Sequence, residues 1–284
     1  MTETNNSTII DRSFKKAIGG GLSGSIAMFF QISSLMWLRT TMNYQYRYGY
    51  DFKTSISNLY NDGGIKRFYR GYLPALAVAP LSRFGDVASN TYITNYFKNN
   101  NNIPIPIQTL IASSIATSWR VFLVPIDTIK TSLQVEGKKA IPLLKNKVKN
   151  DGFRIMYNGS IASLSASFVG HYPWFLTYNF LNQNIEKPGN DENGKKFLRN
   201  GLIGFSSSIV SDSCSNSLRV LKTSKQTYPN NIGYLDIGKN IIKNDGLLGL
   251  MGRGLKTRIL TNGLQGMIFT IGWKYFEEKI IKTE

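Results

Sequence analysis

Cysteine and histidine are nearly absent from this chain, which has one of each in 284 residues. A single cysteine, Cys214, excludes an internal disulfide and a cysteine-based zinc cluster. With one histidine, the sequence offers no candidate Ser-His-Asp set, and it contains no glycine-rich phosphate loop of the nucleotide-hydrolase type. We therefore expect no enzymatic activity, no metal site and no bound cofactor.

Acidic residues are scarce as well. The chain has 17 aspartates and glutamates against 34 lysines and arginines, which gives a formal net charge of +17. Such a balance suits nucleic acid, an anionic membrane surface or an anionic solute. Residues 1–13 are polar and lack an apolar core, so we expect no secretory signal.

Long uncharged runs are few. Residues 17–38, 99–119 and 155–185 carry no Asp, Glu, Lys or Arg and are long enough for a bilayer core of about 30 Å. Other apolar stretches are interrupted by charges, which are costly in a membrane unless they face protein or water. Two interpretations remain at this point: a soluble basic protein, or a membrane protein whose helices surround water.

One ten-residue pattern occurs three times, beginning at residues 34, 125 and 217, so that the copies lie 91 and 92 residues apart. The middle copy contains Pro125, Asp127, Lys130 and Gln134. Proline bends a helix, and the three polar side chains, spaced by three and four residues, share one helical face. Repetition at a fixed interval predicts a chain built from three copies of one unit.

A second landmark repeats in the same order. An Asn-Asp-Gly triplet begins at residues 61, 150 and 244 and is followed by a glycine at 71, 159 and 254. Each unit thus predicts a long helix, a short amphipathic helix that the Asp-Gly pair ends, and a second long helix after the later glycine. We expect the second long helices at about 72–97, 160–184 and 255–281.

These three repeats, with Pro-x-Asp-x-x-Lys and a glycine-initiated second helix, resemble the mitochondrial carrier family over residues 14–281. The resemblance implies an all-α membrane fold of six tilted transmembrane helices in a pseudo-threefold barrel, with three short amphipathic helices on the matrix side. It implies repeats over residues 1–104, 105–193 and 194–284. It also implies a multi-pass monomer of the mitochondrial inner membrane that moves a small, mostly anionic metabolite by alternating access.

In that family, acids and bases on neighbouring odd-numbered helices pair on the matrix side and close the cavity. The matching acid positions here are Met36, Asp127 and Arg219, the base positions are Arg39, Lys130 and Lys222, and the bracing amides are Asn43, Gln134 and Gln226. Only Asp127 with Lys222 can form such a pair, and Arg219 would oppose Arg39. The resemblance therefore implies a weakened matrix gate.

The opposite gate departs from the family pattern too. Tyr178, Asn179 and Asn182 stand where an aromatic residue, an acid and a base are expected, and Trp273, Lys274 and Glu277 show the charges exchanged. The first repeat offers only neutral candidates within 90–94. We expect this gate to close through hydrogen bonds.

Substrate contacts in the family lie about seven and eight residues after the glycine of each even-numbered helix. Those positions are Ala166, Ser167, Thr261 and Asn262, with Val78 and Ala79 in the first repeat. Because these residues are neutral, anchoring an anion would fall to Arg83, Arg120 or Arg258, with Asp86 and Asp212 as partners. The alternative is that Arg120 and Asp212 simply pair with each other.

The resemblance implies cardiolipin bound at the helix starts marked by Gly71, Gly159 and Gly254, where backbone N–H groups favour phosphate. A nucleic-acid partner would fit the net charge but not the glycine-rich spans. The remaining alternative is a carrier-like membrane adaptor that no longer transports, which the weakened gates would suit.

Overall fold

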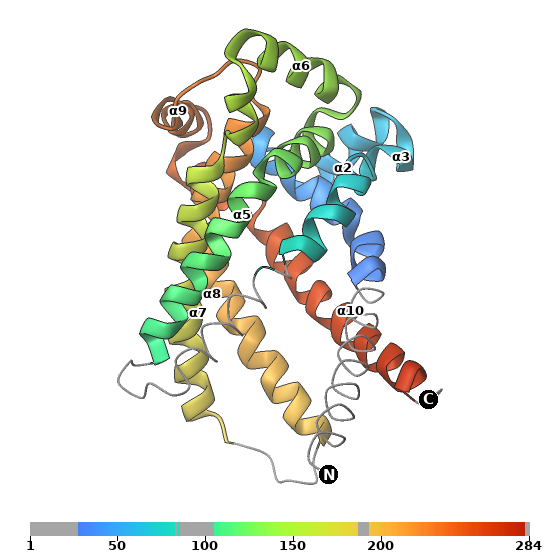
Figure 1. Cartoon of the computed structure of the whole chain (residues 1–284), viewed down its shortest axis with the longest axis vertical. Coiled ribbons are helices and arrows are strands. Elements are labelled where there is room, and N and C mark those ends of the chain that lie inside the picture. The colour runs from blue at the N-terminus through green and yellow to red at the C-terminus, as the bar shows by residue number, and fades with distance from the viewer. Residues whose placement is uncertain (1–27, 83–84, 86–104, 187–192, 282–284) are drawn as a thin grey trace, which may run out of the picture. The chain divides into compact units, whose positions relative to one another are not determined.

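The computed structural model describes residues 28–82, 85, 105–186 and 193–281. These ranges contain helices and connecting turns and no strand. The helices are 28–48, α2 (Phe52–Asn61), α3 (Gly64–Phe68), 72–82, α5 (Ile105–Glu136), η1 (Gly137–Lys139), α6 (Ala140–Asp151), η2 (Phe153–Tyr157), α7 (Ser160–Asn184), α8 (Asn193–Thr227), α9 (Tyr234–Gly252) and α10 (Leu255–Ile281) (Figure 1).

The chain divides into two compact units. One combines residues up to Leu35 with residues from Gly263 onward, and here the Gln31 side-chain amide donates to the Gln265 carbonyl at 2.9 Å. The other unit extends from Met36 to Asn262 and contains nearly all the predicted site residues. None of the helices in the described ranges combines the length and the apolar character needed to cross a membrane.

The predicted starts of the second long helices are confirmed. Helix α7 begins directly after Gly159, α10 directly after Gly254, and helix 72–82 directly after Gly71. The φ angles of the three glycines are +88°, +64° and +88° respectively, a left-handed conformation that other residues rarely adopt. The expected extents of 160–184 and 255–281 match. Of the expected 72–97 helix, residues 72–82 and 85 are helical and the others lie outside the described residues.

The three predicted amphipathic stretches also form helices. The Asp51 carboxylate begins α2 by accepting hydrogen bonds from the backbone N–H groups of residues 53 and 54, which satisfies two donors without helical partners. Helix α6 buries Leu144 against residues 155 and 156, and α9 buries Ile237 and Ile241. As predicted, the Asp-Gly pairs end α2 and α6, whereas α9 continues past Gly246 across a break in its backbone.

Small side chains allow α7 and α8 to lie side by side (Figure 1). The Ser211 hydroxyl on α8 donates to the Gly170 carbonyl on α7 at 2.8 Å. A β-carbon at Gly170 would stand 3.0 Å from that hydroxyl, so a larger residue would push the helices apart. Helix α5, in contrast, continues without interruption through Pro125.

Candidate functional site: charged and amide contacts between the repeats

The predicted ion pair between the second and third repeats is present. The Asp127 carboxylate on α5 lies 2.6 Å from Lys222 Nζ on α8, and its other oxygen accepts a hydrogen bond from Lys130 of the same helix. The three side chains are 15–23% exposed, so the group is largely buried but still in contact with solvent. One carboxylate therefore holds two lysines, one of them on another repeat.

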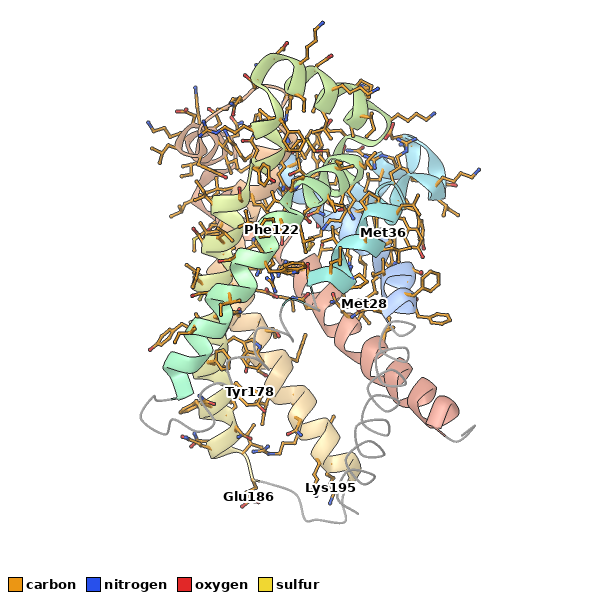
Figure 2. The ribbon with its side chains drawn as sticks, in the orientation of Figure 1. Met28, Met36, Phe122, Tyr178, Glu186 and Lys195 are labelled. Carbon is orange, nitrogen blue, oxygen red and sulfur yellow. The ribbon has the colours of Figure 1, made fainter. Side chains whose placement is uncertain are left out.

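The amide residues connect helices as well. Asn43 Nδ2 donates to Gln134 Oε1 at 2.6 Å, linking helix 28–48 to α5. Gln134 Nε2 in turn approaches the sulfur of Met36 at 3.6 Å, and Met36 is fully buried (Figure 2). Gln226 Nε2 on α8 donates to the Thr128 hydroxyl on α5 at 3.1 Å. Amide side chains thus link α5 both to helix 28–48 and to α8.

The other charged gate positions are less connected. Among the described residues, Arg39 makes no hydrogen bond or ion pair, and Arg219 makes a single hydrogen bond, from its Nε to the Ser215 hydroxyl of its own helix at 3.3 Å. The opposition of Arg39 and Arg219 stays a prediction.

The three helix-starting glycines pack against the next repeat in cyclic order. A β-carbon on Gly71 would lie 2.8 Å from the Lys130 carbonyl oxygen on α5, and one on Gly159 would lie 2.9 Å from Gln226 Cγ on α8. A β-carbon on Gly254 would lie 2.8 Å from the Tyr46 ring on helix 28–48. Close approach between repeats is therefore a second reason, besides backbone conformation, for glycine at these positions.

Three cations follow the same cycle. Each bonds to carbonyls at the end of the first long helix of the next repeat, which is α5, α8 or helix 28–48. Arg67 donates to the carbonyls of residues 134 and 135 at 2.8 and 2.7 Å, and Lys147 donates to the carbonyl of Gln226 at 3.1 Å. Arg253 donates to the carbonyls of residues 46 and 47 at 3.4 and 3.3 Å. These groups lack partners within their own helices, so each repeat caps a helix of the next.

The two arginines of this cycle are held by the acids of the Asp-Gly pairs. Asp62 lies 2.5 Å from Arg67, and Asp245 lies 2.5 Å from Arg253. Lys147 is instead a buried amine, and burial, which disfavours its charged form, lowers its pKa to about 8. The second-to-third contact is thus the one in this cycle whose cation can lose its proton near physiological pH.

A second charged cluster joins α8 and α10 near the predicted substrate positions. Arg258 Nε donates to Asp212 Oδ1 at 2.7 Å, and Asn262 donates to the other oxygen of the same carboxylate. The Asp212 side chain is 5% exposed and that of Arg258 is 16% exposed. Two of the predicted substrate residues therefore converge on one aspartate.

The other predicted substrate residues are distributed differently. Ala166 on α7 is fully buried, and Thr261 is 2% exposed, with its hydroxyl bonded to the carbonyl of Thr257. Ser167 is half-buried and bonds to the carbonyl of residue 163. Arg120 lies on α5 within electrostatic range of Arg219, whereas Arg83 is outside the described residues. A contact role for these residues stays a prediction.

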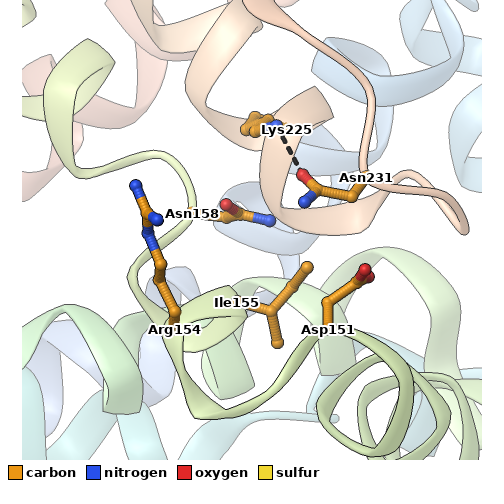
Figure 3. A pocket seen from close by; sticks show the side chains of 6 residues that line it. All are labelled: Asp151, Arg154, Ile155, Asn158, Lys225 and Asn231. Carbon is orange, nitrogen blue, oxygen red and sulfur yellow. Dashed lines mark hydrogen bonds between the residues drawn. The ribbon is translucent and has the colours of Figure 1, made fainter.

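A polar pocket of about 440 Å³ lies beside Gly159, lined by Asp151, Arg154, Ile155, Asn158, Lys225 and Asn231 (Figure 3). Lys225 Nζ donates to Asn231 Oδ1 at 2.8 Å across it. The backbone N–H of Gly159 is already bonded to the Tyr234 hydroxyl at 3.0 Å. Among the described residues, no three His, Cys, Asp or Glu side chains could hold a metal ion.

Sequence reasoning missed Arg199, which caps α7 from α8. Its guanidinium donates to the carbonyls of residues 182, 185 and 186 and to the Asn182 side-chain oxygen, at 2.7 to 3.2 Å. One turn before this point, Tyr178 (Figure 2) stacks on Trp174 with ring centroids 5.0 Å apart. Because main-chain oxygens are the acceptors, no acidic residue in the sequence indicates this contact.

The chain is similar to several curated carriers. It is 26% identical over 148 residues to a mitochondrial carrier-like protein of Acanthamoeba polyphaga mimivirus, covering 51% of this chain and 57% of that one. It is 26% identical over 183 residues to mitochondrial thiamine pyrophosphate carrier 1 of Candida albicans, covering 60% and 59%. It is 27% identical over 244 residues to a mitochondrial pyrimidine nucleotide transporter of Saccharomyces cerevisiae, covering 74% and 64%.

Each match spans less than two thirds of the relative's own length. The family profile described as mitochondrial carrier protein matches residues 104–189 and 193–284. Those ranges make up more than half of the chain and include α5 to α10 with their connecting turns. The protein therefore belongs to the mitochondrial carrier family.

Proposed function

We propose that the protein moves a small anionic metabolite across the mitochondrial inner membrane by alternating access. It would do so as a multi-pass monomer of six tilted helices in a pseudo-threefold barrel. The cyclic contacts of Gly71, Gly159 and Gly254 support this arrangement, because each repeat touches the next and the third returns to the first. Transport of this kind requires neither a bound cofactor nor an enzymatic step.

The observation that carries the proposal is the pair between Asp127 on α5 and Lys222 on α8. It joins two long helices of different repeats through side chains that apolar surroundings would penalise. A partly exposed ion pair contributes about 1 kcal/mol, which is small enough to break and reform during a transport cycle. With one such pair where the family pattern has three, the matrix gate would be weak.

The charged residues of α8 and α10 support an anionic solute. Arg219 and Arg258 lie within electrostatic range of each other, with Asp212 as an acid beside them. Guanidinium groups bind carboxylate and phosphate with two parallel hydrogen bonds. Two of the relatives are named for thiamine pyrophosphate and for pyrimidine nucleotides, which both contain phosphate.

For the helix starts at Gly71, Gly159 and Gly254 we propose a bound phospholipid such as cardiolipin. The pocket beside Gly159 supplies Arg154 and Lys225, whose positive charges suit a phosphate head group. Tyr234 occupies the Gly159 N–H, so the lipid phosphate would rely on these side chains at that start.

Uptake into reconstituted vesicles tests the transport proposal. We expect the wild-type protein to exchange a radiolabelled anion, and Asp127→Asn to change the rate several-fold while the protein stays folded. Glu186→Gln, the same chemical change at an exposed carboxylate, is the matched control. Vesicles that exclude every small anion offered would contradict transport and favour the adaptor alternative, which the single gate pair suits.

A further inference from the structure

The residue directly before the helix-starting glycine differs in the second repeat. It is Arg70 in the first repeat and Arg253 in the third, but Asn158 in the second. Each arginine bonds to the acid of its own Asp-Gly pair. Arg70 lies 3.5 Å from Asp62. Arg253 lies 2.5 Å from Asp245. Because asparagine carries no charge, the second repeat lacks the guanidinium that its acid would bind.

The acid of the second repeat, Asp151, is left without a partner as a result. Among the described residues, its carboxylate makes no ion pair and no side-chain hydrogen bond. Lys225 lies within electrostatic range of it, but the Lys225 ammonium is bonded elsewhere, to Asn231 Oδ1 at 2.8 Å and to the carbonyl of Ile232 at 2.5 Å. Lys147 supplies the main-chain cap of this repeat, so only the contact to the acid lacks a cation.

The pocket of Figure 3 lies at the place of the missing arginine. Its volume of about 440 Å³ is within the range of small-molecule sites, and Asp151 and Asn158 both line it. The side-chain NH₂ of Asn158 is buried and has no acceptor. Arg154, on the opposite side of Ile155 from Asp151 in the figure, has no bonded partner among the described residues. A ligand that satisfies these groups removes the cost of leaving them unpaired.

These unpaired groups require both signs of charge in one ligand. Asp151 accepts hydrogen bonds from a cation, whereas Arg154 and Asn158 donate them to an anion. With Lys225, the lining carries two positive charges and one negative charge. A simple cation would be repelled by the two positive charges, and a simple anion would leave Asp151 unpaired. A ligand with an ammonium group beside a phosphate satisfies both sides.

We propose that this pocket binds an ethanolamine phosphodiester, with its ammonium on Asp151 and its phosphate on Arg154 and Asn158. The same chemical group is the head group of phosphatidylethanolamine and, in free form, part of glycerophosphoethanolamine. The inference rests on the phospholipid contact proposed for the helix start at Gly159 and specifies the head group there. The ammonium takes the place of the guanidinium that Arg253 supplies in the third repeat.

The thermal stability of purified protein tests this, because a ligand of the folded state raises the melting temperature. The soluble probes are glycerophosphoethanolamine and glycerophosphoglycerol. The lipid probes, in detergent micelles, are phosphatidylethanolamine and phosphatidylglycerol. The members of each pair share the phosphodiester and differ in the ammonium, and we expect the ethanolamine member to stabilise more. A preference in the soluble pair assigns a free ligand, and a preference in the lipid pair alone assigns the lipid.

Two variants test where the ammonium binds. Asp151→Asn removes the acid and should lower the apparent affinity for the ethanolamine probe about tenfold or more, with the affinity for the glycerol probe kept. Asn158→Arg supplies the missing guanidinium, which should pair with Asp151, raise the melting temperature of the ligand-free protein and abolish the ethanolamine preference. Asp236→Asn, the same exchange as the first at an exposed position of α9, is the control and should keep the preference.

Three results would overturn the proposal. If both members of each pair stabilise wild type and Asp151→Asn equally, the ammonium contact is wrong, while the phospholipid contact at Gly159 stands. If none of the four probes raises the melting temperature of wild-type protein, the head-group assignment and the phospholipid contact at this helix start both fail. An ethanolamine preference that survives in both Asp151→Asn and Asn158→Arg assigns the ligand to another place on the protein.

Discussion

The ammonium group of Lys147 on α6 donates a hydrogen bond to the main-chain oxygen of Gln226 near the end of α8, at 3.1 Å. The lysine is 4% exposed, and the charges that act on it are those of Glu136, Arg47, Lys225 and Asp151. A second-repeat amine thus reaches a third-repeat helix end in the position where the other two contacts of the cycle use arginine.

This contact predicts a specific pH dependence. The pKa of Lys147 falls from 10.5 in the unfolded chain to about 8 in the fold, so the unfolded chain binds more protons between these values. The contribution of Lys147 to stability should therefore increase from pH 8 to 10.5 and be lost as the pH falls through 8. Melting temperature against pH measures it, with each kcal/mol worth roughly 2–4 °C.

Two variants isolate the lysine in that experiment. Lys147→Arg keeps the charge and does not titrate in this range, so the difference from wild type should vary with pH only between 8 and 10.5. Lys149→Arg makes the same change at an exposed position of α6 and should leave the profile unaltered. Parallel melting-temperature profiles of the wild type and Lys147→Arg would contradict the assignment of this pH dependence to Lys147.

Packing between repeats predicts unequal effects for two glycines with positive φ. Gly159 and Gly64 have φ angles of +88° and +61°, but only at Gly159 would a β-carbon collide with the next repeat. Gly64→Ala should cost about 1–2 kcal/mol from backbone strain. Gly159→Ala should cost more, because Gln226 must also move, and equal losses of melting temperature would show that packing is not the reason.

The cap on α7 predicts a large effect from one exchange. Arg199→Ala removes the donors that satisfy three main-chain oxygens, and each unsatisfied group costs about 1–3 kcal/mol unless water replaces the donor. We expect a fall of several degrees in melting temperature, with Arg199→Lys intermediate. The control is Lys195→Ala, a cation removed from the exposed first turn of α8.

The amide bridge between Asn43 and Gln134 predicts coupling between the first two repeats. A double-mutant cycle with Asn43→Ala and Gln134→Ala should give an interaction free energy of about 0.5–1.5 kcal/mol. Chemical or thermal unfolding of the four proteins provides the measurement. Strictly additive losses would mean that the 2.6 Å contact contributes no stability.

Features that recur in the sequence were the most predictable. The starts of α7 and α10 follow from the glycines at 159 and 254, because left-handed backbone before a helix selects glycine at the same place in each repeat. The pair of Asp127 with Lys222 followed from the family resemblance, since its residues match the repeated charge pattern.

Contacts that end on main-chain oxygens were not predictable in the same way. Arg67, Lys147 and Arg253 occupy different positions in their motifs, and their acceptors are carbonyls that every residue possesses. The capping role of Arg199 was not predicted for the same reason, because its acceptors are mostly main-chain oxygens. The pairing of Arg258 with Asp212 was open because Arg120 was the alternative partner of Asp212. Only the structure, in which Arg258 on α10 bonds to Asp212 on α8, distinguishes the two arginines.

The return of the third repeat to the first has a consequence for cooperativity. In an open solenoid, units can be removed from the end while the others remain ordered. Here the Arg253 contacts to the carbonyls of residues 46 and 47 join the third repeat to the first. Deleting any one repeat uncaps a helix of the next repeat and leaves the capping cation of the previous repeat without its carbonyl acceptors. We therefore expect the closed set to unfold in one step and two-repeat fragments to have no stable fold.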